Sequence, residues 1–169
     1  MKVECSKEKL ERALTLCERA TSKNPTLPIL AYVLIESSGS NLVFRATNLD
    51  ISFEVSIPAK VEKPGISAIK GTTLLGFISN TPKDKSVSME LVDGGMVVKV
   101  PGGEATLKTV SHEDFPKISK STKEPGLVLD AISLSSGIRS VAYSASVSHI
   151  KPELSSVVIY SDGKAGMVI

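Results

Sequence analysis

The side chains in this sequence that could bind a metal ion or take part in catalysis are few and scattered. Histidine, glutamate and aspartate follow one another at 112–114, but three consecutive side chains do not readily converge on one ion, so we interpret this stretch as a solvated turn. Cys5 and Cys17 lack metal-ligand spacing and are expected to be buried, reduced thiols. The segment SDGKAG at 161–166 contains a Gly-Lys pair but lacks the earlier glycine and the following serine or threonine of a phosphate-binding loop. We interpret it as a hairpin turn. The sequence predicts no catalytic residue, no metal site and no cofactor.

A row of basic side chains suggests a different chemistry, the binding of phosphate groups. Along the first predicted helix, basic residues recur on one flank at i, i+3, i+10 and i+14: Lys9, Arg12, Arg19 and Lys23. Glutamates interrupt the neighbouring rows at positions 8, 11 and 18. Two interpretations remain open: a solvated face with ion pairs at i,i+4, or a stripe that meets phosphates without reading sequence. No aromatic residue is interleaved, so stacking on single-stranded bases is not expected.

The helix that carries this row belongs to a predicted α+β domain. A strand at 1–5 precedes the helix, which runs from Ser6 as its N-cap to about Thr21 and has one apolar face. Strands at 29–36 and 42–46 form a hairpin, and a strand at 51–57 alternates apolar and polar residues. A second helix begins at Thr72 and runs through 78. Further strands are predicted at 86–91, 96–100 and 104–109, which gives an antiparallel domain that ends near Ile118.

The chain then begins a second, similar unit. Residues 119–126 (SKSTKEPG) read as a linker, followed by a short strand at 127–129, a cap at Asp130 and a helix at 132–144. Sliding the first unit forward by 124 positions places Leu10 on Leu134 and Pro28 on Pro152. A period this long indicates duplicated domains. We expect a complete unit at 1–118 and a partial one at 127–169, so the chain is expected to be a piece of a longer protein.

Composition limits the classes of protein that fit. The chain has 169 residues, and its 20 basic and 18 acidic residues give a formal charge of +2, which excludes a histone-like polycation and an acidic tail protein. A hydrophobic fraction of 41% excludes a disordered chain. No apolar run approaches the roughly 20 residues that span a membrane, and the N-terminus has no export signal. We therefore expect a cytoplasmic protein without a membrane partner.

Three motifs in this chain resemble a known family. Residues 25–30 (PTLPIL), 46–50 (ATNLD) and 114–116 (DFP) are similar to those of the bacterial sliding clamp, the beta subunit of DNA polymerase III. The resemblance covers residues 1–118 and continues more weakly to 169. It implies a DNA-clamp fold, with antiparallel sheets outside and two helices per domain lining a pore around duplex DNA. It also implies a non-catalytic homodimeric ring that tethers the polymerase III alpha subunit and is placed on DNA by a clamp loader.

The resemblance also implies roles for individual residues. Arg12 matches a basic position on the pore-lining first helix, and Asn24 stands where a family arginine contacts DNA. Ser148 and His149 belong to a segment that matches a second DNA-near loop. Leu154 matches a leucine in the pocket that captures partner peptides.

A subunit interface is implied near the end of the first unit. Leu107 matches an apolar interface residue, whereas Glu104 and Ala105 replace an arginine and a phenylalanine of some members. Because the second unit stops at Ile169, we expect this polypeptide alone neither to close a ring nor to hold partner peptides.

Two other kinds of function remain as alternatives. A strand-rich domain that acts on a small molecule requires titratable groups that converge in a pocket, and the sequence offers almost none. A duplicated domain that binds duplex DNA directly through its sheet requires basic and apolar residues on a sheet face. Here the basic residues cluster on a predicted helix instead.

Overall fold

A computed structural model describes residues 1–21, 27–82, 85–118, 128–148, 151–161 and 167–168. The chain divides into two compact units, Met1–Ser119 and Lys120–Ile169. Lys23, Asn24, His149 and the predicted linker at 119–126 lie outside the described residues.

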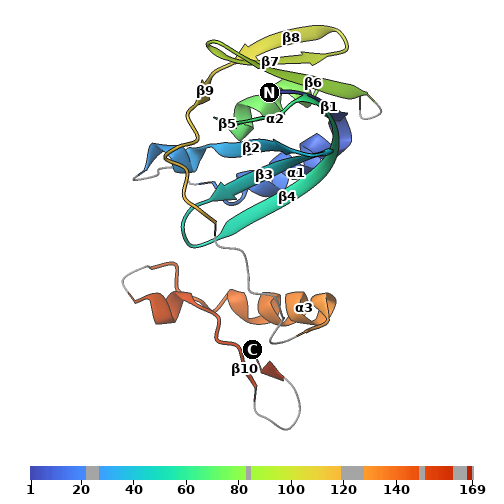
Figure 1. The fold of residues 1–169 in the computed structure, drawn as a ribbon. Coiled ribbons are helices and arrows are strands. Elements are labelled where there is room, and N and C mark those ends of the chain that lie inside the picture. The colour runs from blue at the N-terminus through green and yellow to red at the C-terminus, as the bar shows by residue number, and fades with distance from the viewer. Residues whose placement is uncertain (22–26, 83–84, 119–127, 149–150, 162–166, 169) are drawn as a thin grey trace. The chain divides into compact units, whose positions relative to one another are not determined.

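The first unit is built on one antiparallel sheet, as the sequence predicts (Figure 1). The strand order is β8-β7-β6-β1-β4-β3-β2-β5-β9, and every neighbouring pair of strands is antiparallel. The strands are β1 (Lys2–Ser6), β2 (Val33–Ser38), β3 (Asn41–Thr47), β4 (Ser52–Lys63), β5 (Gly65–Ile69), β6 (Ser86–Val92), β7 (Gly95–Val100), β8 (Gly103–Leu107) and β9 (Thr109–Val110).

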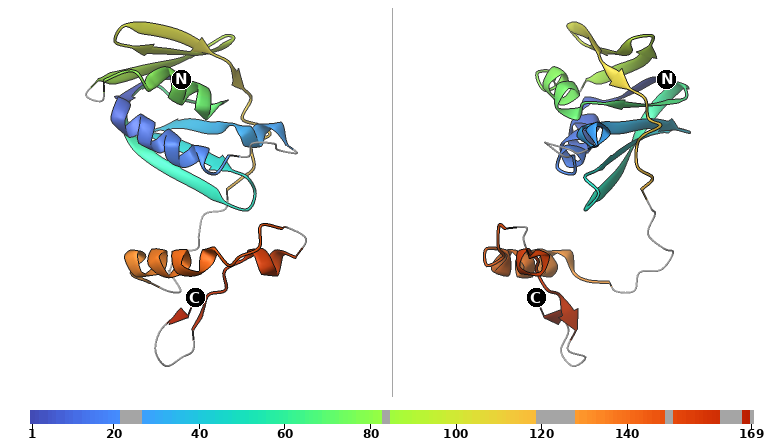
Figure 2. Two further views of the ribbon diagram at one scale, coloured as in Figure 1. Left: turned by 180° about the vertical axis from the view of Figure 1, so that it is seen from behind. Right: turned by 90° about the vertical axis from the view of Figure 1, so that its left-hand side faces the viewer.

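Two helices, α1 (Lys7–Glu18) and α2 (Gly71–Ile78), lie side by side on one face of this sheet (Figure 2). The apolar face predicted for α1 is fully buried: Leu10, Ala13, Leu14, Cys17 and Ala20. They pack in one cluster with side chains of both β2 and β3. The helix ends at Glu18, three residues earlier than predicted, and the side chain of Ser6 does not cap it.

The strands predicted in the first unit are present, but several boundaries differ: β4 extends to Lys63, and the strand predicted at 104–109 is divided into β8 and β9. Residues 28–31 form a short 3-10 helix, η1 (Pro28–Ala31), so β2 begins at Val33 instead of residue 29. Proline suits the first turn of such a helix because its missing N–H has no partner there. The prediction also missed β5, since Pro-Gly at 64–65 looks like a terminator. In the structure β4 and β5 are not neighbours: β4 pairs with β1 and β3, and β5 pairs with β2 and β9.

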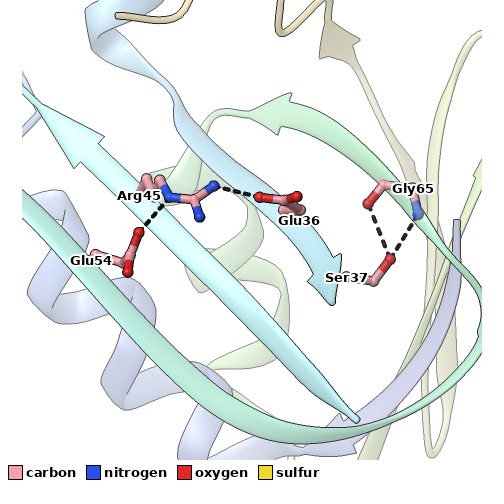
Figure 3. Close-up of polar contacts among 5 residues, drawn as sticks. All are labelled: Glu36, Ser37, Arg45, Glu54 and Gly65. Carbon is pink, nitrogen blue, oxygen red and sulfur yellow. Dashed lines mark hydrogen bonds and ion pairs between the residues drawn. The ribbon is translucent and has the colours of Figure 1, made fainter. Parts of the chain in front are cut away.

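Polar contacts connect neighbouring strands at the two places shown in Figure 3. Arg45 on β3 lies between two glutamates, with its Nη1 2.5 Å from Glu36 Oε2 on β2 and its Nε 2.6 Å from Glu54 Oε2 on β4. At the end of β2, Ser37 Oγ donates to the Gly65 carbonyl at 3.0 Å and accepts from the Gly65 N–H at 2.7 Å. These ion pairs are partly exposed, so each one contributes little to the free energy of unfolding.

The motif at 46–50 forms the turn between β3 and β4. Asn48 Oδ1 accepts hydrogen bonds from the Asp50 and Ile51 N–H groups, and Thr47 Oγ1 accepts one from Leu49. These bonds hold Leu49 at φ +80°, a conformation that costs free energy for a residue other than glycine. The motif therefore specifies a tight turn, which accounts for the choice of Thr and Asn at 47–48.

The second unit repeats the start of the first. Its helix α3 (Ala131–Ala142) begins and ends 124 positions after α1, and its 3-10 helix η2 (Pro152–Ser155) lies 124 positions after η1. The short strands β10 (Tyr160–Ser161) and β11 (Met167–Val168) pair antiparallel. Asp130 caps α3 as predicted, since its Oδ1 accepts from the Ser133 N–H at 2.8 Å. The strand predicted at 127–129 is wrong for its described residues, Val128 and Leu129.

The two related helices differ in burial. No residue of α3 is fully buried, and Ile132 is 80% exposed, whereas α1 buries a continuous apolar face. The reason is that α1 packs on a sheet, while the described part of the second unit provides only a two-stranded ribbon.

Candidate nucleic-acid interface

The basic side chains predicted on α1 lie on its outer face. Lys9, Arg12 and Arg19 are all exposed, because the opposite face of the helix is buried against the sheet and α2. Arg19 follows the last residue of the helix and still has α-helical backbone angles. The fold thus presents three cations on one solvent-facing surface, which we call the α1 basic face.

Two of the three glutamates of α1, Glu11 and Glu18, face contacts within the unit, whereas Glu8 is exposed. Glu11 is bound by Lys7, whose Nζ lies 2.6 Å from Glu11 Oε2 and whose side chain is only 2% exposed. Among the described residues, no salt bridge involves Lys9, Arg12 or Arg19. Within the described part of the chain, the three cations therefore form no i,i+4 ion pair.

Glu18 is turned away from the α1 basic face toward the start of α2. Its Oε1 is buried and, among the described residues, has no hydrogen-bond partner. The carboxylate accepts a hydrogen bond from the Thr72 backbone, and a Cβ at Gly71 would overlap Glu18 Oε1. Burial raises the pKa of Glu18, against the smaller opposing effects of the Thr72 bond and Lys70. A side chain at position 71 would therefore displace the Glu18 carboxylate from this contact.

Replacing Glu18 by glutamine is expected to stabilise the first unit at pH 7. When folding raises the pKa of a carboxyl group, the folded protein loses stability as the pH rises from the pKa of the unfolded state to that of the folded state. Glutamine carries no charge that must be desolvated. Above this pH range the free energy of unfolding of the variant should therefore exceed that of the parent, and below it the two should be equal. Urea unfolding followed by circular dichroism from pH 4 to 8 measures this difference. A variant less stable at pH 7 would show that the ionised carboxylate at Thr72 outweighs its desolvation.

The two cysteines are buried as the sequence predicts, and both are free. Burial raises the pKa of each thiol to about 12, with a further contribution from Glu4 at Cys5 and from Glu18 at Cys17. We expect a colorimetric disulfide reagent at pH 8 to leave both thiols unmodified in the native protein and to modify both after denaturation in guanidinium. Rapid modification of the native protein would contradict this placement.

Of the remaining predicted DNA contacts, Ser148 alone is a described residue. Ser148 is exposed in the second unit, and its N–H donates to Ser146 Oγ at 3.1 Å. The predictions for Lys23, Asn24 and His149 stay predictions, because these residues lie outside the described part of the chain.

Leu154, predicted for a partner-peptide pocket, is 58% exposed on η2, and its carbonyl accepts from the Ser146 N–H at 2.8 Å. Its counterpart 124 positions earlier, Leu30, is only 4% exposed.

The predicted subunit interface lies on β8, an edge strand of the sheet. Glu104 is exposed and lies 2.8 Å from Lys99 on β7, so its charge is already paired within the unit. Ala105 is half-buried, and Leu107 packs against the main hydrophobic core. The backbone edge of β8 is therefore more available to a neighbour than the Leu107 side chain.

Sequence reasoning missed two features of this region. Lys7 was not singled out, although its i,i+4 spacing to Glu11 is the pattern of a helix ion pair. The contact of Glu18 with Thr72 joins residues far apart in the sequence, and no local signal indicates it.

No helix among the described residues is long and apolar enough to cross a membrane.

Comparison with known proteins gives a consistent result over the first unit. Residues 1–119 match the family model described as DNA polymerase III beta subunit, N-terminal domain. The chain is 28% identical over 159 residues to the beta sliding clamp of Synechococcus elongatus, covering 93% of this chain and 42% of that protein. It is 30% identical over 118 residues to the beta sliding clamp of Treponema pallidum, covering 69% of this chain and 32% of that protein.

Solved structures show the same fold. The beta subunit of DNA polymerase from Streptococcus pyogenes superposes with a TM-score of 0.84 at 25% identity, over 96% of this chain and 44% of that one. The polymerase III beta protein of Caulobacter crescentus superposes with a TM-score of 0.89 at 23% identity, over 98% of this chain and 45% of that one. The chain spans less than half the length of these relatives, and the clamp fold predicted from the sequence is confirmed.

Proposed function

The chain belongs to the family of DNA polymerase III beta subunits, and from this premise we propose that it supplies the N-terminal domain of a replicative sliding clamp. In this proposal the clamp is a non-catalytic processivity factor that encircles duplex DNA in the cytoplasm. The observation that carries the proposal is the α1 basic face: three exposed cations on one helix face, free of salt bridges to the described residues.

The physical advantage of such an arrangement is weak and sequence-independent contact. Cations that meet phosphates through solvent-exposed side chains bind any duplex and lose affinity steeply with salt. A ring does not need strong contacts, because its closed topology prevents escape while weak contacts permit sliding. Tethering then raises the effective concentration of a bound polymerase at the template.

The proposed partners follow from the same role. They are double-stranded DNA of any sequence, the polymerase III alpha subunit, the clamp loader and a second subunit that completes a homodimeric ring. The β8 edge at Glu104, Ala105 and Leu107 is the proposed contact with that subunit, and Leu154 is proposed to contact partner peptides. Asn24, Lys23, Ser148 and His149 are proposed to lie near DNA with the α1 basic face.

A topological experiment tests this function on the whole protein that contains this chain. Clamp loader and ATP should place it on a nicked circular plasmid, where it should co-elute with the DNA during gel filtration. Cutting the plasmid once should release it, because a ring slides off free ends. Retention on linear DNA, or equal binding without the loader, would indicate a direct duplex binder instead.

A further inference from the structure

Residues of two family motifs, those at 25–30 and 114–116, line the same cavity in the first unit. None of the residues that line this cavity is proposed above to contact DNA. The cavity has a volume of about 440 Å³ and is lined by residues of η1 and of the segment that follows β9. Ile29, Tyr32 and Val110 are half-buried, and Leu27 is 49% exposed at its rim. We call this cavity the η1–β9 pocket; it lies wholly within the first unit.

Both walls of the η1–β9 pocket pack against one hydrophobic cluster of the first unit, through Ile29 and Tyr32 on one side and Val110 on the other. Leu30, in the middle of η1, is only 4% exposed, and the Leu30 N–H donates to the Leu27 carbonyl at 3.1 Å. On the other side, Phe115 is 9% exposed in a hydrophobic cluster with Leu34 and Ala68. The Phe115 N–H donates to the His112 carbonyl at 3.0 Å, which closes the turn that carries Asp114. The pocket is therefore formed before any ligand arrives, which lowers the entropic cost of binding.

The chemistry of the lining selects the kind of ligand. The apolar side chains and the ring of Tyr32 suit a branched apolar group, and a cavity of a few hundred cubic ångströms is the usual size for such a site. Asp114 is exposed and lines the pocket, and among the described residues it forms no salt bridge. An apolar side chain flanked by a basic one complements both features.

We propose that the η1–β9 pocket binds a short linear segment of a partner protein, which inserts an apolar side chain and places an arginine or lysine beside Asp114. A second copy of this chain fits less well, because two identical pockets facing each other would bring like charges at Asp114 together. The proposal does not depend on DNA binding or on ring closure.

Titration of the full chain, labelled with ¹⁵N, tests the proposal. The probe is the peptide acetyl-Gly-Leu-Ile-Arg-Gly-amide, and its control carries Glu in place of Arg. We expect saturable shifts confined to the backbone amides around Ile29, Tyr32, Val110 and Asp114. The arginine peptide should bind roughly three- to fivefold tighter than the glutamate peptide, because an exposed ion pair adds modestly to affinity.

Two variants separate a specific site from general charge attraction. Asp114→Asn should remove the preference for the arginine peptide, whereas Asp93→Asn, which changes an exposed aspartate at the turn between β6 and β7, should keep it. Absence of saturable shifts, shifts spread over other surfaces, or equal binding of the two peptides would overturn the proposal. Shifts at these amides that appear when the chain alone is concentrated would identify a second copy as the occupant and would also overturn it.

Discussion

Reversing the charges of Lys9, Arg12 and Arg19 to glutamate is expected to weaken binding of this chain to duplex DNA more than tenfold at low salt. The three cations are exposed on one helix face and form no salt bridges with the described residues, so each is available to a phosphate. Each lost phosphate contact lowers the slope of log affinity against log salt by about 0.9, which gives about 2.7 for three contacts. Fluorescence anisotropy with a labelled 30-base-pair duplex between 25 and 200 mM salt measures both quantities.

A variant of equal charge outside α1 provides the control. Lys60, Lys63 and Lys117 are also exposed, and their replacement by glutamate changes the net charge by the same amount. This control should retain most of the affinity and of the salt slope, because the arrangement of charges matters and not their total. Equal losses in the two triple variants would contradict a DNA-facing role for α1. Circular dichroism should show both variants folded.

Replacing Leu10 by alanine is expected to destabilise the first unit by about 2–5 kcal/mol, the range for a fully buried leucine. Leu10 is 0% exposed in the main core and fixes α1 to the sheet. The α1 basic face depends on this packing, so hydrogen exchange of α1 amides should also accelerate. Urea unfolding of the variant and its parent measures the loss.

The internal repeat offers a matched control for this substitution. Leu134 lies 124 positions after Leu10, at the same place in α3, but it is only half-buried. Leu134→Ala should therefore change the stability of the first unit by less than about 0.5 kcal/mol, as expected for a residue that belongs to the other compact unit. A comparable loss of stability in the first unit would show that the two units fold as one cooperative body.

The sequence predicts much of this fold because its strongest signals are local. The apolar positions of α1 recur at helical spacing, and that spacing alone predicted which residues are buried. The offset of 124 positions predicted a second helix in the right place, although α3 begins one residue before and ends two residues before the predicted range of 132–144. The caps and turns at Asp130 and at 112–115 likewise depend on neighbouring residues.

The features that sequence reasoning missed depend on contacts between distant segments. The Pro-Gly pair at 64–65 ends one strand and begins another because β4 and β5 have different partners in the sheet. Lys7 is buried because the fold covers its stem while Glu11 holds its charge. Glu18 faces α2, and only the structure distinguishes it from an exposed glutamate such as Glu8.

The most direct test of a DNA-facing α1 is cleavage of DNA by an iron chelate tethered to that helix. Thr15 is exposed on α1, and Ser56 is exposed on β4, so Thr15→Cys and Ser56→Cys give two matched attachment sites. Cys5 and Cys17 are buried and should not compete for the label. With the whole clamp on nicked circular DNA, the chelate at position 15 should cleave the duplex evenly along its length, and the chelate at position 56 should cleave it far less. Equal cleavage from both positions, or cleavage only from position 56, would contradict the account.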